Sequence, residues 1–373
     1  FGTSAEGFPE IVLRFTDNAV ARDIVLDPRL GAAEAFMDGR LVIEEGDVMG
    51  LIGLLRMNSA WERGGSNLRP KRLKRLINSA AFAAEQINNR IGSKKNVAHH
   101  YDIGNDLYAL MLDPEHWQYS CAYWGKGVTT LGEAQGAKLA HIAKKLHLAP
   151  GQEVLDIGCG WGGMAIHLAR EHGVRVTGIT LSEEQAALAR QRVQAAGVAD
   201  KVTILLEDYR DTAASGRRFD RIVSVGMFEH VGRAQFETFF EACAKILADD
   251  GVMLLHTIGR FGGPGTTDAF TRKYIFPGGY IPALSETLAA SEKYRLIASD
   301  VETLRLHYAK TIHAWYANCM THKDKIVAMY DDKFFRMWTF YLAGAATVFE
   351  NGGMGNYQIQ YIRSRHALPI TRD

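Results

Sequence analysis

The sequence predicts an α/β protein in which a doubly wound parallel sheet is covered by helices on both faces. After residue 152 of the 373-residue chain, short apolar segments alternate with longer segments of helical periodicity, a pattern typical of parallel sheets. A run of glycines follows the first apolar segment, and polar residues follow several others. Because open α/β sheets bind ligands at the carboxyl ends of their strands, we expect a binding site there.

The sequence predicts the strands and helices of this sheet and an insertion near its C-terminal end. Residues 258–292 are punctuated by glycine and proline and residues 307–350 are aromatic-rich and helical, so we expect a lid insertion over about 258–350. The expected strands are residues 153–157, 175–180, 202–206, 221–225, 252–257 and 357–362, and the expected helices between them are 164–171, 183–196 and 235–247.

Charge marks a boundary in the N-terminal part of the chain. Residues 1–55 hold ten acidic and four basic residues, whereas residues 63–95 hold nine basic residues and only Glu85 as an acid. A shift this sharp, next to the flexible pair Gly64 and Gly65, predicts a domain boundary.

We therefore expect three parts: an N-terminal domain over 1–62, a basic helical linker over 63–96 and a larger domain over 97–373. The pattern of the N-terminal domain predicts a small α+β domain, and the periodicity of the linker predicts a helix over about 70–90. In the first domain, the expected strands are 11–15 and 41–43, and the expected helix is 51–57, with Asp47 as its cap.

The composition excludes several classes of protein. Hydrophobic residues make up 47% and charged residues 23% of the chain, unlike disordered, collagen-like or small disulfide-bridged proteins. No apolar run reaches the ~18–20 residues of a membrane-spanning helix, and no secretory signal is visible, although Phe1 leaves open that a preceding piece is missing. The scattered cysteines, without CxxC spacing, indicate a cytoplasmic protein and offer no zinc site: Cys121, Cys159, Cys243 and Cys319.

The glycine-rich turn after strand 153–157 is the main functional signal. Its spacing is GxGxGG, not the GxGxxG of dinucleotide sites, and it has no phosphate-binding lysine. Asp156, near the strand end, would repel a phosphate but can hold an amino group through a bridging contact. The pattern therefore fits S-adenosylmethionine, an adenosine that carries an amino acid, with Gly158 and Gly160 letting it approach the backbone. A tight packing turn is the alternative.

Polar residues after the next strands extend this site. Thr180 and Gln185 follow the second strand, where a dinucleotide site would have an acid. Ser182 is a candidate cap for the following helix. Asp208 and Tyr209, after the third strand, are placed to bracket an adenine, although a helix cap or turn is the alternative for Asp208.

A second group of polar residues has the composition of a reaction site. Glu229 follows strand 221–225, His256 ends strand 252–257, Tyr316 lies in the aromatic helical segment, and Cys121 lies far upstream. Three of them have a structural alternative. Glu229 can be a charge at a helix start, His256 can be a core histidine with satisfied hydrogen bonds, and Cys121 can be a small buried hydrophobic residue.

Taken together, a series of ordered motifs resembles the cyclopropane-fatty-acyl-phospholipid synthases, strongly over about 97–366 and less specifically over 8–55. The mycolic acid cyclopropane synthases are relatives, but the N-terminal region looks more like the phospholipid-acting branch. The resemblance implies a Rossmann-like methyltransferase sheet and an N-terminal lipid-associated domain. The motifs are His100–Asp106, Leu112–Pro114, Tyr119–Trp124, Leu155–Gly163, Asp208–Asp211, Val225–Gly232, His256–Gly259, Lys273–Gly279 and Ala314–Tyr316.

The resemblance also implies residue roles. A cysteine that family members often carry in the C-terminal helix is replaced here by Ala345, so covalent catalysis through that position is excluded. The residues expected to line the cofactor pocket are Tyr119, Ser120, Gly158, Gly160, Thr180, Leu181, Gln185, Asp208 and Tyr209, and those expected to hold a bicarbonate ion are Cys121, Glu229, His256, Ile258 (through its backbone) and Tyr316.

The implied reaction adds the methyl carbon of S-adenosylmethionine to the cis double bond of an unsaturated phospholipid acyl chain and closes a cyclopropane ring. It passes through a carbocation that bound bicarbonate deprotonates, so water must be kept away. Three alternatives stay open: a methylene- or methyl-branched product, a non-enzymatic lipid-binding module, and a metal hydrolase, although the histidines near residue 100 lack ligand spacing. The aromatic rings of Tyr274, Phe276, Trp315 and Tyr316 can stabilise the cation by ~1–2 kcal/mol each or simply pack in the core.

The basic segment 69–95 suggests a partner. Near a membrane surface, each lysine or arginine adds roughly 1 kcal/mol of attraction to anionic headgroups, although pairing with the acidic N-terminal domain is an alternative. No nucleic-acid recognition motif is present. We expect a cytoplasmic protein at the inner face of the membrane, with a homodimer through the N-terminal domain suggested by the resemblance.

Overall fold

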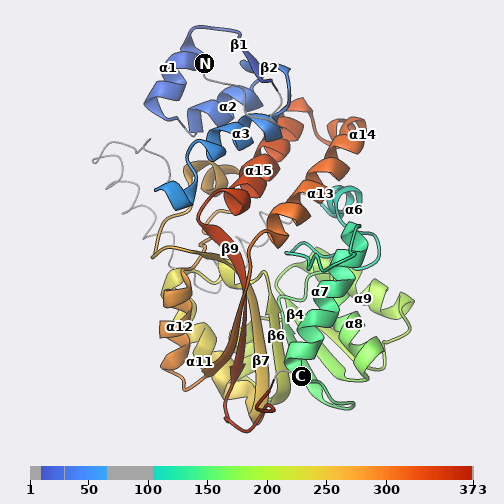
Figure 1. Ribbon diagram of the computed structural model, residues 1–373. Coiled ribbons are helices and arrows are strands. Elements are labelled where there is room, and N and C mark those ends of the chain that lie inside the picture. Colours follow the sequence, from blue (N-terminus) through green and yellow to red (C-terminus); the bar gives the residue numbers. More distant parts are fainter. Residues whose placement is uncertain (1–9, 29, 65–103, 372–373) are drawn as a thin grey trace. The chain divides into compact units, whose positions relative to one another are not determined.

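The computed structural model describes residues 10–28, 30–64 and 104–371, and these divide into two compact units (Figure 1). The first unit contains the described residues up to 64 together with 267–277 and 308–354, and the second contains 104–266, 278–307 and 355–371. The linker expected over 63–96 and its helix fall almost entirely outside the described residues. The domain limits expected from the sequence stay a prediction.

The N-terminal part of the first unit contains the expected α+β elements. The strands expected at 11–15 and 41–43 are confirmed as an antiparallel pair. The expected helix and its cap are confirmed: the helix begins at Val48, directly after Asp47, whose Oδ1 accepts a hydrogen bond from the amide of Gly50 at 2.7 Å. The elements are β1 (Val12–Phe15), α1 (Ala19–Leu26), α2 (Leu30–Met37), β2 (Leu41–Glu45) and α3 (Val48–Met57).

The rest of the first unit comes from the aromatic-rich C-terminal region. Its longest helix, α15 (Asp332–Glu350), packs against α2 and α3. Arg336 on α15 donates to the carbonyl of Met37 at 2.7 Å, which ties residues far apart in the sequence together. The other elements are a π-helical turn (Thr271–Ile275), α13 (His307–Thr321) and α14 (Lys323–Met329).

The second unit is built on a seven-stranded sheet of order β5-β4-β3-β6-β7-β9-β8. The adjacent pairs from β5 to β7 are parallel, whereas β8 and β9 pair antiparallel. The expected α/β class is therefore confirmed. The strands are β3 (Glu153–Ile157), β4 (Arg175–Thr180), β5 (Val202–Leu206), β6 (Phe219–Val225), β7 (Leu247–Arg260), β8 (Ile297–Leu304) and β9 (Met354–Ile362).

Several elements, most of them helices, were not predicted from the sequence, and two of these lie at the sheet edge and in the lid segment. The strand β8 was not predicted, because its alternation is masked by acidic residues and most of its side chains are exposed at the sheet edge. The helix α12 (Leu284–Glu292) lies within the segment expected to form the lid, and its residues belong to the second unit.

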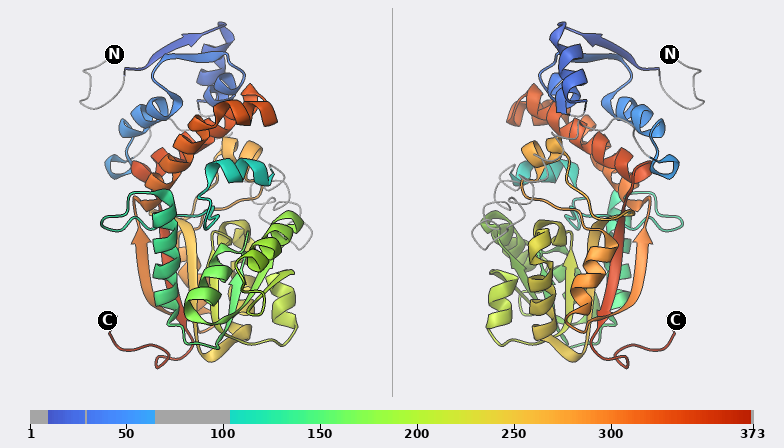
Figure 2. Two further views of the ribbon diagram at one scale, coloured as in Figure 1. Left: turned by 90° about the vertical axis from the view of Figure 1, so that its right-hand side faces the viewer. Right: turned by 90° about the vertical axis from the view of Figure 1, so that its left-hand side faces the viewer.

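Helices cover both faces of this sheet, as its two hydrophobic clusters require. Along β3, Val154 belongs to a cluster with residues of α7 (Leu131–Leu146), α8 (Gly163–His172) and α9 (Glu183–Ala195). Leu155 and Ile157 belong to the other cluster, with residues of α10 (Tyr209–Ala214) and α11 (Phe236–Ile246). Figure 2 turns one face and then the other toward the viewer, with α8 and α9 in green and α11 and α12 in yellow and orange.

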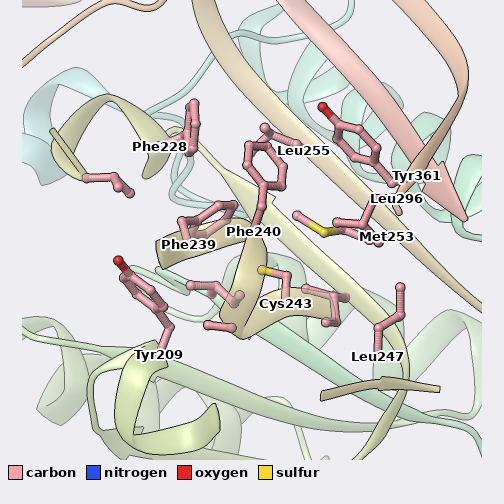
Figure 3. Close-up of a cluster of buried hydrophobic side chains, with 14 of the residues drawn as sticks. Tyr209, Phe228, Phe239, Phe240, Cys243, Leu247, Met253, Leu255, Leu296 and Tyr361 are labelled. Carbon is pink, nitrogen blue, oxygen red and sulfur yellow. The ribbon is translucent and has the colours of Figure 1, made fainter. Parts of the chain in front are cut away.

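The second cluster has an aromatic centre (Figure 3). Phe239 and Phe240 from α11 meet Phe228, with ring centroids 5.1–5.6 Å apart. Phe240 also lies 5.5 Å from the ring of Tyr361 on β9, so it joins three elements. All three phenylalanines are fully buried.

We expect Phe240→Ala to lower the free energy of unfolding by about 3–5 kcal/mol, because it removes a ring from a site that cannot collapse fully. Urea unfolding followed by fluorescence measures this. Ile297→Ala is the control, since Ile297 is 42% exposed on the edge strand and should change stability by less than about 1 kcal/mol. Equal losses for the two variants would contradict the assignment of this core.

Candidate active site

The order of the strands places a ligand site in the second unit. The chain runs from β3 outward through β4 to β5 and then returns to β6 on the other side of β3. Such a switch point leaves a crevice at the carboxyl ends of the strands. A pocket of about 1060 Å³, its open mouth included, lies there and is lined by residues that follow β3, β4, β5 and β6.

The structure brings together the complete set of residues expected to contact the cofactor. They come from the ends of β3, β4 and β5 and from the loop before α7. The lining includes Tyr119, Ser120, Asp156, Gly158, Gly160, Thr180, Leu181, Gln185, Asp208 and Tyr209. Their contacts with a ligand stay a prediction.

The glycine turn has the backbone that the motif requires. Gly158 has a φ of +78°, and a Cβ atom added there would lie 2.7 Å from Cγ of Met227. A Cβ atom at Gly163, the first residue of α8, would lie 2.1 Å from the carbonyl oxygen of His116. The chain therefore passes too close to its neighbours for side chains at these positions.

Asp156 offers an acceptor inside the pocket. Its side chain is 1% exposed, and Oδ2 has no hydrogen-bond partner among the described residues. Burial raises the pKa of this carboxyl to about 7, and the nearby Lys138 opposes the shift. An unpartnered buried carboxylate is costly, so this atom fits a ligand that brings a cationic donor, such as the amino group of S-adenosylmethionine.

The structure decides two alternatives after β4 and β5. Ser182 caps α9, since its Oγ accepts from the amide of Gln185 at 3.2 Å, whereas Thr180 donates to Oε1 of Gln185 at 3.0 Å. Asp208 caps α10 and accepts from Arg210 Nη2 at 2.6 Å. The cap interpretation is therefore correct for Asp208, although the residue also lines the pocket.

Sequence reasoning missed several residues of the pocket wall. Trp117, Gln118 and Trp161 also line it. Trp161 donates from its indole nitrogen to Asn105 Oδ1 at 2.8 Å, and its ring lies 4.9 Å from that of Tyr108 on α6 (Asn105–Met111). Trp161 lies within the glycine motif, and this position in the sequence could have predicted that it lines the pocket.

The residues expected to hold bicarbonate are only partly brought together. The carboxylate of Glu229 accepts from the backbone amide of Ile258 on Oε1 at 2.6 Å, while Oε2 has no partner within the described part of the chain. The ring of His256 is fully buried, and its Nδ1 lies 3.1 Å from the Nε2 atom of Gln358. Cys121 is also fully buried and donates to the carbonyl of Ala122 at 3.4 Å.

Burial dominates the electrostatics of these groups. It raises the pKa of Glu229 to about 7, against the hydrogen bond from Ile258, and it raises the pKa of Cys121. It also lowers the pKa of His256 well below its usual range, so the imidazole is neutral. His256 Nε2 and Glu229 Oε2 are unpartnered among the described residues. Both atoms could therefore take a hydrogen bond from or to a bound polar group.

Tyr316 belongs to the first unit, unlike the other four residues of this set. It lies on α13, and its hydroxyl donates to Oδ2 of Asp47 at 3.1 Å. Burial and this carboxylate raise its pKa. Its place in an anion site stays a prediction.

The aromatic residues expected near a carbocation also lie in the first unit. Trp315 is 1% exposed and packs edge-on against Tyr308 at 5.8 Å, and the hydroxyl of Tyr274 donates to Glu34 Oε1 at 2.8 Å. Both therefore have structural contacts of their own. The cation-stabilising role stays a prediction.

The described residues contain neither a metal-binding cluster nor a membrane-spanning helix. Across residues 10–28, 30–64 and 104–371, no group of three or more His, Cys, Asp or Glu side chains is arranged to hold a metal ion. His99, His100 and Asp102 lie outside these ranges. Within the same ranges, no helix combines the length and apolar character needed to cross a membrane.

A family model described as mycolic acid cyclopropane synthetase matches residues 88–359. The chain belongs to this family. It is 35% identical over 372 residues to the cyclopropane-fatty-acyl-phospholipid synthase of Escherichia coli K12, which covers 100% of this chain and 93% of the relative. It is also 43% identical over 287 residues to a probable fatty acid methyltransferase of Pseudomonas putida, with 74% and 72% covered.

Solved structures agree with this family assignment. The cyclopropane synthase MmaA2 from Mycobacterium tuberculosis has a TM-score of 0.68 and 34% identity, covering 72% of this chain and 97% of its own. Mycolic acid cyclopropane synthase CmaA1, in complex with SAH and CTAB, has a TM-score of 0.67, 34% identity and the same coverage. The resemblance stated from the motifs is confirmed, and the protein is an S-adenosylmethionine-dependent methyltransferase.

Proposed function

We propose that this enzyme transfers the methyl carbon of S-adenosylmethionine to the cis double bond of an unsaturated phospholipid acyl chain and forms a cyclopropane ring. The observation that carries the proposal is the match to the E. coli synthase along 372 residues, the N-terminal segment included. The match to cyclopropane mycolic acid synthase 3 spans 270 residues, or 69% of this chain. The longer match favours a phospholipid over a mycolic acid as substrate.

The pocket of the second unit is the proposed cofactor site. S-adenosylmethionine, when bound, supplies an electrophilic methyl group, and bicarbonate, when bound, supplies a base. Asp156 would hold the amino group, and the glycines of the turn would let the ligand lie against the backbone. Thr180, Gln185, Asp208 and Tyr209 would contact the rest of the nucleoside.

Electron flow in the proposed reaction sets what the other residues must do. The π electrons of the alkene form a bond to the methyl carbon, and positive charge develops on the acyl chain. Loss of a proton from the added carbon then closes the ring. A carbon–hydrogen bond next to a cation is very acidic, so the position of the base matters more than its strength.

The buried polar group around Glu229 is the proposed anion site. Glu229, His256, Cys121 and the backbone of Ile258 would hold bicarbonate, whereas the contact that the resemblance implies for Tyr316, a residue of the first unit, stays a prediction. Their low exposure also keeps water away, and water would otherwise trap the cation as an alcohol.

The direct test supplies vesicles of a mono-unsaturated phospholipid together with S-adenosylmethionine and follows the lipids by mass spectrometry and proton NMR. We expect an added mass of one methylene group and upfield ring protons. Vinylidene protons would instead indicate a methylene-branched product. No change in lipid mass with correctly folded protein would overturn the proposal.

Membrane association is a separate part of the proposal. The protein would act in the cytoplasm at the inner face of the membrane, with the basic linker on anionic headgroups and a homodimer formed through the lipid-associated domain 1–62. Reversing the charges of Lys71, Arg72, Lys74 and Arg75 is expected to weaken binding to anionic vesicles at least tenfold at low salt, measured by co-sedimentation. Unchanged binding would assign this segment to pairing within the protein.

A further inference from the structure

Lys138 is a fully buried lysine with no role so far. It lies on α7 in the second unit and is among the largest side chains that are completely buried. An ammonium group taken out of water is very unfavourable unless hydrogen bonds and opposite charges replace the water. The partners of Lys138 therefore indicate why a lysine stands here.

Both hydrogen-bond partners of Lys138 are pocket residues. Its Nζ atom donates to Oε1 of Gln118 and, at 3.0 Å, to Oγ of Ser120. Gln118 and Ser120 line the cofactor pocket. One turn earlier on the same helix, Gln135 donates to the carbonyl of Ser120 at 3.0 Å and to that of Gln118 at 3.3 Å. Gln135 thus holds the main chain of this loop, whereas Lys138 holds its side chains.

The direction of these hydrogen bonds fixes what Ser120 can do. An ammonium group only donates, so Ser120 Oγ is the acceptor in its bond to Lys138. The hydroxyl hydrogen of Ser120 is then left to donate elsewhere. Because Ser120 is 6% exposed and lines the pocket, a group bound there is the available acceptor. The same logic fixes Gln118, whose Nε2 donates to the carbonyl of His116 at 3.3 Å.

The charges around the pocket have a matching arrangement. Burial lowers the pKa of Lys138 to about 7, while Asp113, Cys121 and Asp156 act in the opposite direction. The pocket wall thus has the acid Asp156 and, behind Ser120, a lysine that an added anion would keep protonated. An amino-acid group carries one cation and one anion, so the two sides complement its two ends.

We propose that Lys138 is a positioning residue for the carboxylate of S-adenosylmethionine: it turns the Ser120 hydroxyl into a donor to that carboxylate and places a positive charge behind it. This inference rests on the proposed cofactor site. It adds a residue outside the pocket wall and an orientation of the ligand, with the carboxylate toward Ser120 and the amino group toward Asp156.

Three ligands test the inference by isothermal titration calorimetry. S-adenosylhomocysteine has both ends of the amino acid, its decarboxylated analogue lacks only the carboxylate, and 5′-methylthioadenosine lacks both. In the unaltered protein we expect the carboxylate to strengthen binding at least tenfold. Lys138→Met should reduce this advantage to less than about threefold and change the affinity for 5′-methylthioadenosine by less than about twofold. Loss of affinity for all three ligands by the same factor would overturn the inference.

Two further variants separate positioning from structure. Ser120→Ala should lose the same carboxylate advantage, and the double variant Lys138→Met/Ser120→Ala should lose no more than either single variant. Gln135→Met, which releases only the main chain of the loop, should weaken the three ligands by similar factors. Additive losses in the double variant would contradict the coupling between Lys138 and Ser120. Failure of the unaltered protein to bind S-adenosylhomocysteine would instead overturn the proposed cofactor site.

Discussion

Glu229→Gln is expected to lower kcat by about 10²–10⁴-fold and to change the dissociation constant of S-adenosylmethionine by less than about threefold. The carboxylate of Glu229 bonds to the amide of Ile258 and not to a residue of the cofactor pocket, and Glu229 is absent from the lining of that pocket. An amide can still accept from Ile258 but can neither release nor take up a proton. Turnover of vesicle lipids and calorimetry of cofactor binding measure the two effects separately.

Glu302→Gln is the matched control for this substitution. Glu302 lies on β8 and pairs with His141 and Lys145; its charge acts on His256 only through space, so its loss removes a carboxylate of the same unit without breaking a hydrogen bond of the proposed anion site. We expect kcat within about twofold of the unaltered enzyme. If Glu229→Gln abolishes cofactor binding, then the division between cofactor pocket and anion site is wrong.

Glu229→Gln also has an expected effect on the free energy of unfolding. Burial raises the pKa of Glu229 from about 4.5 to about 7, so between these values the folded state binds more protons than the unfolded state. Stability contributed by the protonated form is therefore lost as the pH rises through this range and does not return above it. Glu229→Gln removes this loss, and relative to the unaltered enzyme it should gain about 3 kcal/mol between pH 4.5 and pH 8. Urea unfolding at the two pH values measures the difference.

The parts of the site that the sequence predicted are those set by local chain geometry. A strand, an acid and a glycine turn follow one another within residues 153–163, so Asp156 and Gly158 could be placed from spacing alone. Thr180 and Asp208 followed from the rule that ligands bind at carboxyl ends of parallel strands. Their convergence on one pocket is a consequence of the strand order.

The parts that the sequence did not predict depend on contacts between distant segments. The sequence gives no reason to expect Lys138 to be buried, because its burial depends on how α7 packs on the sheet. The start of this helix could have been predicted, because Thr130 and Glu133 form a capping box there. The bond between Tyr316 and Asp47 joins residues 269 positions apart, which no local pattern encodes. The acidic residues Asp300 and Glu302 of the edge strand β8 pair with Lys145 of α7, a contact between distant segments that the sequence does not predict.

Gly158→Ala is expected to raise the dissociation constant of S-adenosylhomocysteine by at least about a hundredfold. The new Cβ atom would lie 2.7 Å from Cγ and 2.8 Å from Cβ of Met227, at a φ of +78° that disfavours side chains. Relief requires the turn or the neighbouring residue after β6 to move, and both line the pocket. Calorimetry measures the affinity, and thermal unfolding measures the accompanying loss of stability.

Gly197→Ala separates backbone strain from loss of the site. Gly197 has a similar φ of +67°, no atom lies within 4 Å of its added Cβ, and it is not part of the pocket lining. The strain should lower stability by about 1–2 kcal/mol and leave the affinity within about twofold. Equal affinities for the two variants would mean that the glycine turn does not contact the ligand. A selective loss in Gly158→Ala would show that the close approach of the backbone, and not its φ angle alone, is what the cofactor requires.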